Sequence, residues 1–140
     1  MYDSVLVATD GSDTATAAVD HAITLASQFD VPLYGIVVLE SRTEYDNAIV
    51  DPEEADRRRR QRAESVLADL EAAADGLALE TTIRTGVPHE EILAYAAEQD
   101  ADVIVIGSRG RSSFKGALLG STVDAVVRQA ARPVLVVDDN

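Results

Sequence analysis

The chain has 140 residues, the length of one domain, and a formal net charge of −13. A charge this negative argues against a surface that binds DNA or RNA through the phosphate backbone, because such binding needs a broad positive footprint. The sequence contains no cysteine, which excludes disulfides, thiolate metal sites and cysteine nucleophiles.

The hydrophobic residues are mostly aliphatic, since they make up 46% of the chain and aromatic residues only 4%. This composition favours a sheet rich in Val and Ile that is covered by helices rich in Ala and Leu. Lys115 is the only lysine in the chain. An acidic, lysine-poor surface favours a halophilic source, because a cytoplasm of high ionic strength screens the repulsion between its negative charges. The alternative is an ordinary acidic protein.

The first residues show no feature of an export signal. They lead directly into an apolar run without a basic segment, and no apolar run in the chain has the length of a membrane span. We therefore expect a cytoplasmic protein with no membrane partner.

Apolar runs and segments of helical spacing alternate along the whole chain. Ser12 or Asp13 is placed to cap the first helix, and Gly35 is a weak point in the second strand. The alternation implies right-handed crossovers onto a mainly parallel sheet. The predicted strands are residues 5–9, 33–39, 79–85, 103–106 and 133–137, and the predicted helices are 13–28, 52–74, a segment that begins at 88, and 121–131.

A basic run at residues 57–62 has two interpretations. It could form a nucleic-acid patch, but acidic residues precede the arginines at four-residue spacing, the orientation that stabilises an exposed helix. We favour a solvated helix face. The pairs predicted from this spacing are Glu53 with Arg57, Glu54 with Arg58, and Asp56 with Arg60.

A glycine-rich segment follows the fourth predicted strand, with the spacing Gly107-x2-Gly110-x9-Gly120-Ser121. It fits neither the Rossmann pattern nor a Walker A loop. Glycines nevertheless let backbone amides approach phosphate oxygens, and Ser121 stands where a helix begins. The segment predicts an anion site. The alternative for Ser121 is an ordinary N-cap that forms a capping box with Asp124, and the two roles are compatible.

Charged residues beside this segment support the same hypothesis. Arg109, Arg111 and Lys115 all lie within it, and arginine can contact phosphate in bidentate fashion, although each of these side chains could instead be solvated. Asp10, after the first strand, could accept hydrogen bonds from ribose hydroxyls or hold a hydrated cation. Its alternative role is to stabilise the turn that it begins. Ligands of open α/β sheets bind where the winding direction reverses, so both loops are expected at one crevice.

The motifs occur in a characteristic order: 5–12 reads VLVATDGS, 85–88 reads TGVP, the glycine pattern follows, and 132–137 reads RPVLVV. Together they resemble the universal stress protein family, UspA-like, over nearly the whole chain. The resemblance implies one domain over residues 1–140. It also implies a five-stranded parallel sheet of order 3-2-1-4-5, an adenine nucleotide alpha hydrolase-like fold, and ATP bound between the first and fourth strands, with Mg²⁺ or Mn²⁺.

The resemblance also implies which residues contact the nucleotide. Asp10 would meet the ribose, Ala8 and Thr9 would line the adenosine pocket, and Val38 would lie against adenine. The ribose and phosphates would be received by Gly107, Gly110, Gly120, Ser121 and Thr122. With Arg109, which its loop position suggests, these residues form the predicted binding site; no residue is assigned a catalytic role.

Similar proteins are often homodimers paired through the last strand. An apolar edge at residues 134–137 would otherwise promote aggregation, which independently favours a covered edge. The leading hypothesis is an ATP-binding stress-response or signalling module. A slow ATPase or nucleotidyl-transfer enzyme is the alternative, although SGGxDS and HxGH motifs are absent; a third hypothesis is an interaction domain without a nucleotide.

Overall fold

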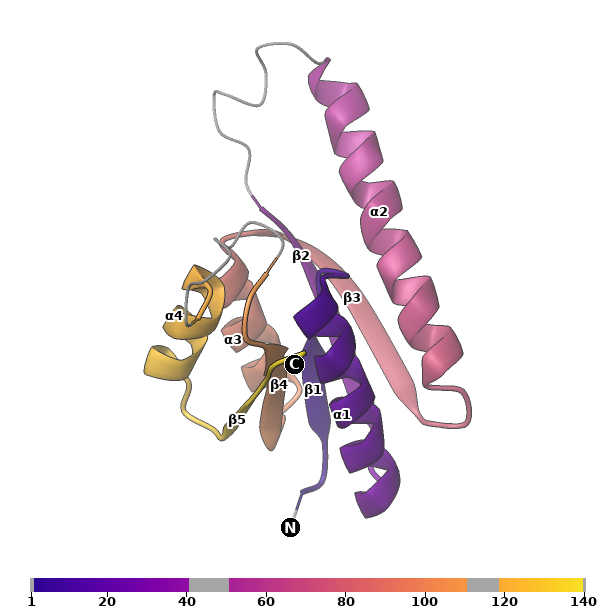
Figure 1. Cartoon of the computed structure of the whole chain (residues 1–140), viewed down its shortest axis with the longest axis vertical. Helices are drawn as coiled ribbons and strands as arrows, with labels where there is room; N and C mark the ends of the chain where they lie inside the picture. Colours follow the sequence, from indigo (N-terminus) through magenta and orange to yellow (C-terminus); the bar gives the residue numbers. More distant parts are fainter. Residues whose placement is uncertain (1, 41–50, 111–118, 140) are drawn as a thin grey trace.

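The computed structural model describes residues 2–40, 51–110 and 119–139. Strands and helices alternate through these ranges, as the apolar periodicity predicts (Figure 1). The elements in chain order are β1 Val5–Ala8, α1 Asp13–Phe29, β2 Leu33–Glu40, α2 Pro52–Ala73, β3 Leu79–Gly86, α3 Pro88–Glu98, β4 Val103–Gly107, α4 Ser121–Gln129 and β5 Val134–Val137.

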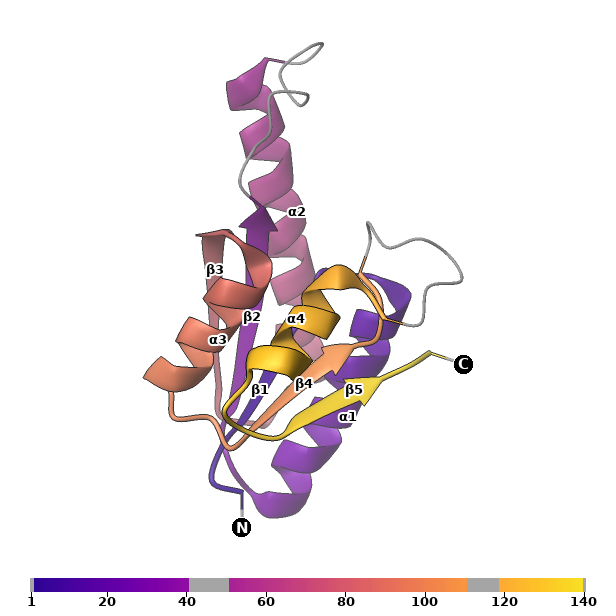
Figure 2. The same cartoon turned by 90° about the vertical axis from the view of Figure 1, so that its left-hand side faces the viewer.

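The strands form one parallel sheet of order β3-β2-β1-β4-β5, which confirms the predicted fold (Figure 2). The central strand β1 pairs with β2 on one side and with β4 on the other, so that Ala8 lies opposite both Ile36 and Ile106. The chain moves toward one edge of the sheet from β1 to β3, and toward the other from β1 through β4 to β5. The winding direction therefore reverses between β1 and β4.

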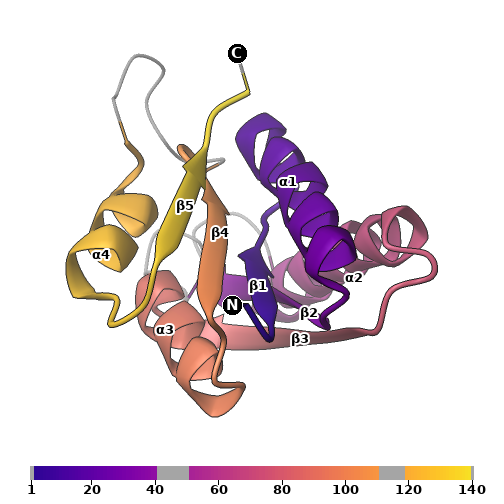
Figure 3. The ribbon, with the colours of Figure 1, turned by 90° about the horizontal axis from the view of Figure 1, so that it is seen from below.

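Helices cover both faces of the sheet, α1 and α2 on one and α3 and α4 on the other (Figure 3). Each face has its own hydrophobic core, because alternate strand residues point to opposite sides. Val5 and Val7 belong to the core under α1 and α2, whereas Leu6 and Ala8 belong to the core under α3 and α4. None of the helices in the described ranges is long and apolar enough to cross a membrane.

The basic run on α2 forms a solvated face, as predicted. The buried residues of this helix, Ala63, Leu67 and Leu70, all lie in its second half. In the first half Glu54 pairs with Arg58, as the spacing predicts, and also with Arg57, while Asp56 pairs with Arg59. The hydrogen bond from Arg57 holds the pKa of Glu54 below its ordinary value. These arginines therefore have acidic partners on their own helix.

Gly35 on β2 leaves the space that the side chain of Leu70 on α2 fills. A Cβ atom at Gly35 would lie 2.5 Å from Leu70 Cδ2, and Leu70 is 2% exposed. A side chain at Gly35 would therefore force the buried Leu70 to shift, whatever the glycine costs the strand itself.

We predict that Gly35→Ala lowers the free energy of unfolding by about 1–3 kcal/mol, because the added methyl group overpacks the core. Urea unfolding monitored by circular dichroism measures the loss. In a Leu70→Ala background the same substitution should cost clearly less, since the two changes are coupled through one contact. Equal costs in both backgrounds would contradict the packing explanation.

Candidate functional site

A cleft lies at the carboxyl ends of β1, β2 and β4, where the winding direction reverses. The first turns of α3 and α4 close its sides. The structure brings all ten predicted site residues to the wall of this cleft: Ala8, Thr9, Asp10, Val38, Gly107, Arg109, Gly110, Gly120, Ser121 and Thr122. Their contacts with a ligand stay a prediction.

Several further residues line the cleft that the sequence did not single out as binding residues. Most are apolar and were assigned only to strands or to helix faces, because an apolar side chain gives no indication in the sequence that it contacts a ligand. The pairing of Ala8 with Ile36 and Ile106 puts these three on one face of the sheet, a placement that needs the strand register. The additional lining residues are Ala15, Ile36, Glu40, Pro88, Ile92, Ile106 and Val123.

Asp10 begins the turn between β1 and α1. Its Oδ1 accepts a hydrogen bond from the backbone N–H of Ser12 at 2.9 Å, which is the turn-stabilising role that the sequence allowed. Gly11 has φ +80°, a conformation that favours glycine. Asp10 also lines the cleft, and a Cβ at Gly110 would lie 2.9 Å from its Oδ2. The two predicted loops therefore meet at this carboxylate.

Gly107 ends β4 against the first turn of α1. A Cβ at this position would lie 2.6 Å from the backbone carbon of Thr14 and 2.7 Å from the nitrogen of Ala15. Backbone cannot move aside as a flexible side chain can, so a larger residue is excluded here. The close approach predicted for this glycine is made by the protein's own helix, independently of any ligand.

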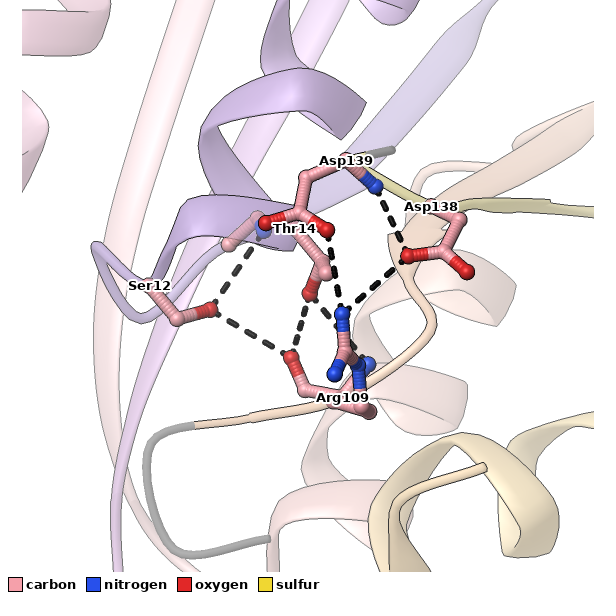
Figure 4. Close-up of polar contacts among 6 residues, drawn as sticks. Ser12, Thr14, Arg109, Asp138 and Asp139 are labelled. Atoms are coloured by element: carbon pink, nitrogen blue, oxygen red, sulfur yellow. Dashed lines mark hydrogen bonds and ion pairs between the residues drawn. The ribbon is translucent and has the colours of Figure 1, made fainter. Parts of the chain in front are cut away.

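The same close approach lets Thr14 hold the backbone of Arg109 (Figure 4). Thr14 Oγ1 accepts a hydrogen bond from the N–H of Arg109 at 3.2 Å and donates one to its carbonyl oxygen. Ser12 Oγ, at 3.4 Å, donates to the same carbonyl. Thr14 is only 3% exposed. The start of the glycine-rich segment is thus fixed to α1 by partly buried hydrogen bonds.

The side chain of Arg109 extends toward the end of the chain (Figure 4). Its Nη2 lies 3.2 Å from Asp138 Oδ1 and 3.0 Å from Asp139 Oδ1. The N–H of Asp139 donates to Asp138 and, with the charge of Arg109, holds the pKa of Asp138 below its ordinary value. The guanidinium thus has partners within the protein. Arg111 and Lys115 lie outside the described residues.

The capping box that was the alternative role for Ser121 does not form. Gly120 occupies the N-cap in an extended conformation, without a side-chain cap, and Ser121 is already the first helical residue. Asp124 instead pairs with Arg128 at 2.9 Å. Gly120 is tied to the end of β4 because its N–H donates to the carbonyl of Ser108 at 2.8 Å. The hydroxyl of Ser121 is therefore not used as a cap.

The start of α4 offers backbone donors to the cleft. The first intrahelical hydrogen bond runs from the N–H of Asp124 to the carbonyl of Gly120, so the N–H groups of Ser121 and Thr122 have no acceptor within the helix. Such a helix terminus attracts anions. Within the described ranges, no group of three or more His, Asp or Glu side chains is arranged to hold a metal ion.

These features define a doubly wound α/β protein with a cleft at its topological switch point. Residues 1–138 match the Universal stress protein family. The chain is 32% identical to universal stress protein MJ0531 of Methanocaldococcus jannaschii, an alignment that covers 98% of this chain and 82% of the relative. The chain therefore belongs to the universal stress protein family.

Solved structures agree with this assignment. The structure of the hypothetical protein MJ0577, also from Methanocaldococcus jannaschii, has a TM-score of 0.86 at 28% identity and covers 100% of this chain and 98% of its own. A universal stress protein solved in complex with cAMP has a TM-score of 0.67 at 28% identity, with 99% of both chains covered. The likeness extends over the whole chain in each case.

We predict that Thr14→Val lowers the free energy of unfolding by about 1–3 kcal/mol, because the partly buried N–H and carbonyl of Arg109 lose a hydrogen-bond partner while the side-chain volume is kept. Thr14→Ser keeps the hydroxyl and should recover most of this loss. Denaturant unfolding of the three proteins tests the role, which would be contradicted by equal stability of the Val and Ser variants.

Proposed function

We propose that this protein binds an adenine nucleotide, ATP, in the cleft and acts as a nucleotide-dependent stress-response or signalling module. The observation that carries the proposal is the meeting of two loops, distant in sequence, at the switch point. One supplies the carboxylate of Asp10, and the other leads to the donor groups at the start of α4. Between them lies an apolar wall.

The cleft has a distinct environment for each part of a nucleotide. Apolar side chains such as Ile36, Val38 and Ile92 offer a surface against which an adenine ring can pack. The carboxylate of Asp10 is suited to ribose hydroxyls. The N–H groups at the start of α4 suit phosphate oxygens, because they add to the positive end of the helix dipole.

Comparison with a relative supports the choice of an adenine nucleotide. The universal stress protein in complex with cAMP has the same fold as this chain over nearly its full length. Its ligand contains an adenine ring, a ribose and a phosphate, the three groups for which this cleft has suitable surfaces. The triphosphate is the finer part of the proposal, and Mg²⁺ or Mn²⁺ would enter with it, held mainly by phosphate oxygens.

We predict that Gly110→Val lowers ATP affinity at least tenfold, because the new side chain would displace the carboxylate of Asp10 and crowd the phosphate path. Gly120→Val should act similarly at the start of α4, where it would obstruct phosphate approach. Isothermal titration calorimetry with ATP and Mg²⁺ measures both effects. Neither change is expected to unfold the domain, which thermal denaturation checks.

A matched control is Ala68→Val, which places the same valine side chain on the exposed face of α2. Wild-type affinity in the Gly110 and Gly120 variants would refute their assigned roles. No heat of binding for the wild-type protein at millimolar ATP would refute the nucleotide proposal itself. Multiple-turnover release of ADP would instead favour the enzyme alternative.

The proposal includes a homodimer formed through β5. This strand lies at an edge of the sheet and is apolar throughout its length, Val134–Val137. Leu135 on β5 is 39% exposed and Val127 on α4 is 46% exposed. An exposed apolar edge favours pairing with another strand, and a second copy of the chain supplies one.

We predict that Leu135→Asp shifts the protein toward the monomer, because it places a charge in the apolar pairing surface. Sedimentation velocity over a range of protein concentrations measures the change. Val87→Asp is the matched control, since Val87 is 43% exposed but lies at the N-cap of α3, where Asp is favourable. Dissociation by both variants, or by neither, would argue against pairing through β5.

A further inference from the structure

Two carboxylates that follow β5 pair with an arginine of the cleft wall. Arg109 is the only basic side chain among the described residues that line the cleft, where Asp10 and Glu40 are acidic. Its guanidinium is paired with both Asp138 and Asp139. The one cation available to an anionic ligand in this part of the structure is therefore already occupied by anions of the protein.

The backbone and side chain of Arg109 are held in different ways. Its N–H and carbonyl are fixed by the buried hydroxyl of Thr14. Among the described residues, its guanidinium, 31% exposed at the side chain, makes single contacts to carboxylates that are 58% and 32% exposed. Exposed pairs of this kind are weak. The side chain can therefore change partners while the backbone stays in place.

A polyphosphate is a strong competitor for this guanidinium. Arginine forms paired, charge-assisted hydrogen bonds with phosphate, whereas each aspartate here contributes one contact to a shared nitrogen. Asp138 and Asp139 directly follow β5, and both carboxylates pair with Arg109. Exchange of the arginine from these carboxylates to a phosphate requires no change in the sheet.

We propose that Asp138 and Asp139 compete with the phosphate groups of the ligand for the guanidinium of Arg109. This competition lowers the affinity for a ligand more when the ligand carries more phosphate charge. This inference rests on the proposed nucleotide function. The competition sets how strongly the site distinguishes a triphosphate from the bare nucleoside. Adenosine, which has no phosphate, leaves the Arg109 pairs intact.

The test compares wild type with the double variant Asp138→Asn and Asp139→Asn by calorimetric titration with ATP, ADP and adenosine, at fixed Mg²⁺ and low salt. We expect ATP affinity to rise about three- to tenfold, because two exposed ion pairs no longer hold the guanidinium. The gain should be smaller for ADP and absent for adenosine. Added salt should reduce the difference between the two proteins.

Two controls separate this effect from general changes. Asp69→Asn with Glu71→Gln alters the net charge equally on the exposed face of α2, toward the opposite end of the sheet, and should leave ATP affinity nearly unchanged. In an Arg109→Gln background, the tail variant should give no gain. Sedimentation velocity verifies that the oligomeric state is the same in all titrations.

Several results would overturn the proposal. They are an equal gain for adenosine and ATP, an equal gain in the α2 control, a gain that persists without Arg109, and unchanged or lower ATP affinity in the tail variant. Each of these leaves the nucleotide function standing if the wild-type protein binds ATP. Absence of ATP binding by the wild-type protein would refute the function, and this inference with it.

Discussion

The close contact between the end of β4 and the first turn of α1 is the constraint on which the cleft depends. Gly107 has no Cβ, so Thr14 and Ala15 reach distances that a larger residue would forbid. Thr14 can then satisfy both backbone polar groups of Arg109. Without this contact, the start of the glycine-rich segment would lose the hydrogen bonds that Thr14 makes to it. The pairing sets the position of the strands, and the contact sets the path of the chain after β4.

The sequence was sufficient to predict the fold because its signals are local and repeated. Apolar runs alternate with helical periodicity, and the ordered motifs resembled one family, so the strand order and the convergence of the loops followed. Helix α4 begins at Ser121 as predicted, but the alternative in which Ser121 is the N-cap of a capping box fails for a physical reason. A Ser followed three residues later by Asp satisfies the capping pattern, but the cap is decided by backbone conformation, and Gly120 already has the extended geometry. Composition alone does not reveal that geometry.

Interactions between distant parts of the chain were the least predictable. Gly35 was interpreted as a weak point because propensity describes a strand by itself, whereas Leu70 approaches from α2. The sequence shows a cluster of basic residues near Gly110. The acidic partners of Arg109, Asp138 and Asp139, lie after a further helix and strand and could not be predicted from that cluster. The cytoplasmic location, the halophilic source and the contacts of the ten site residues with a nucleotide stay predictions. They concern surroundings and ligands rather than the packing of this chain.

An acidic protein that binds a polyanion must create a favourable potential locally, because its overall charge of −13 is repulsive. In the described part of the cleft, the sources are the N–H groups at the start of α4 and the guanidinium of Arg109. The helix terminus cannot be neutralised by a change of side-chain partner, but Arg109 can. Backbone donors thus provide the constant part of the attraction, and the arginine provides a part that the acidic tail opposes. Under the proposed function, a phosphate gains the contribution of Arg109 only as far as it displaces Asp138 and Asp139, whereas the contribution of the backbone donors does not depend on that exchange.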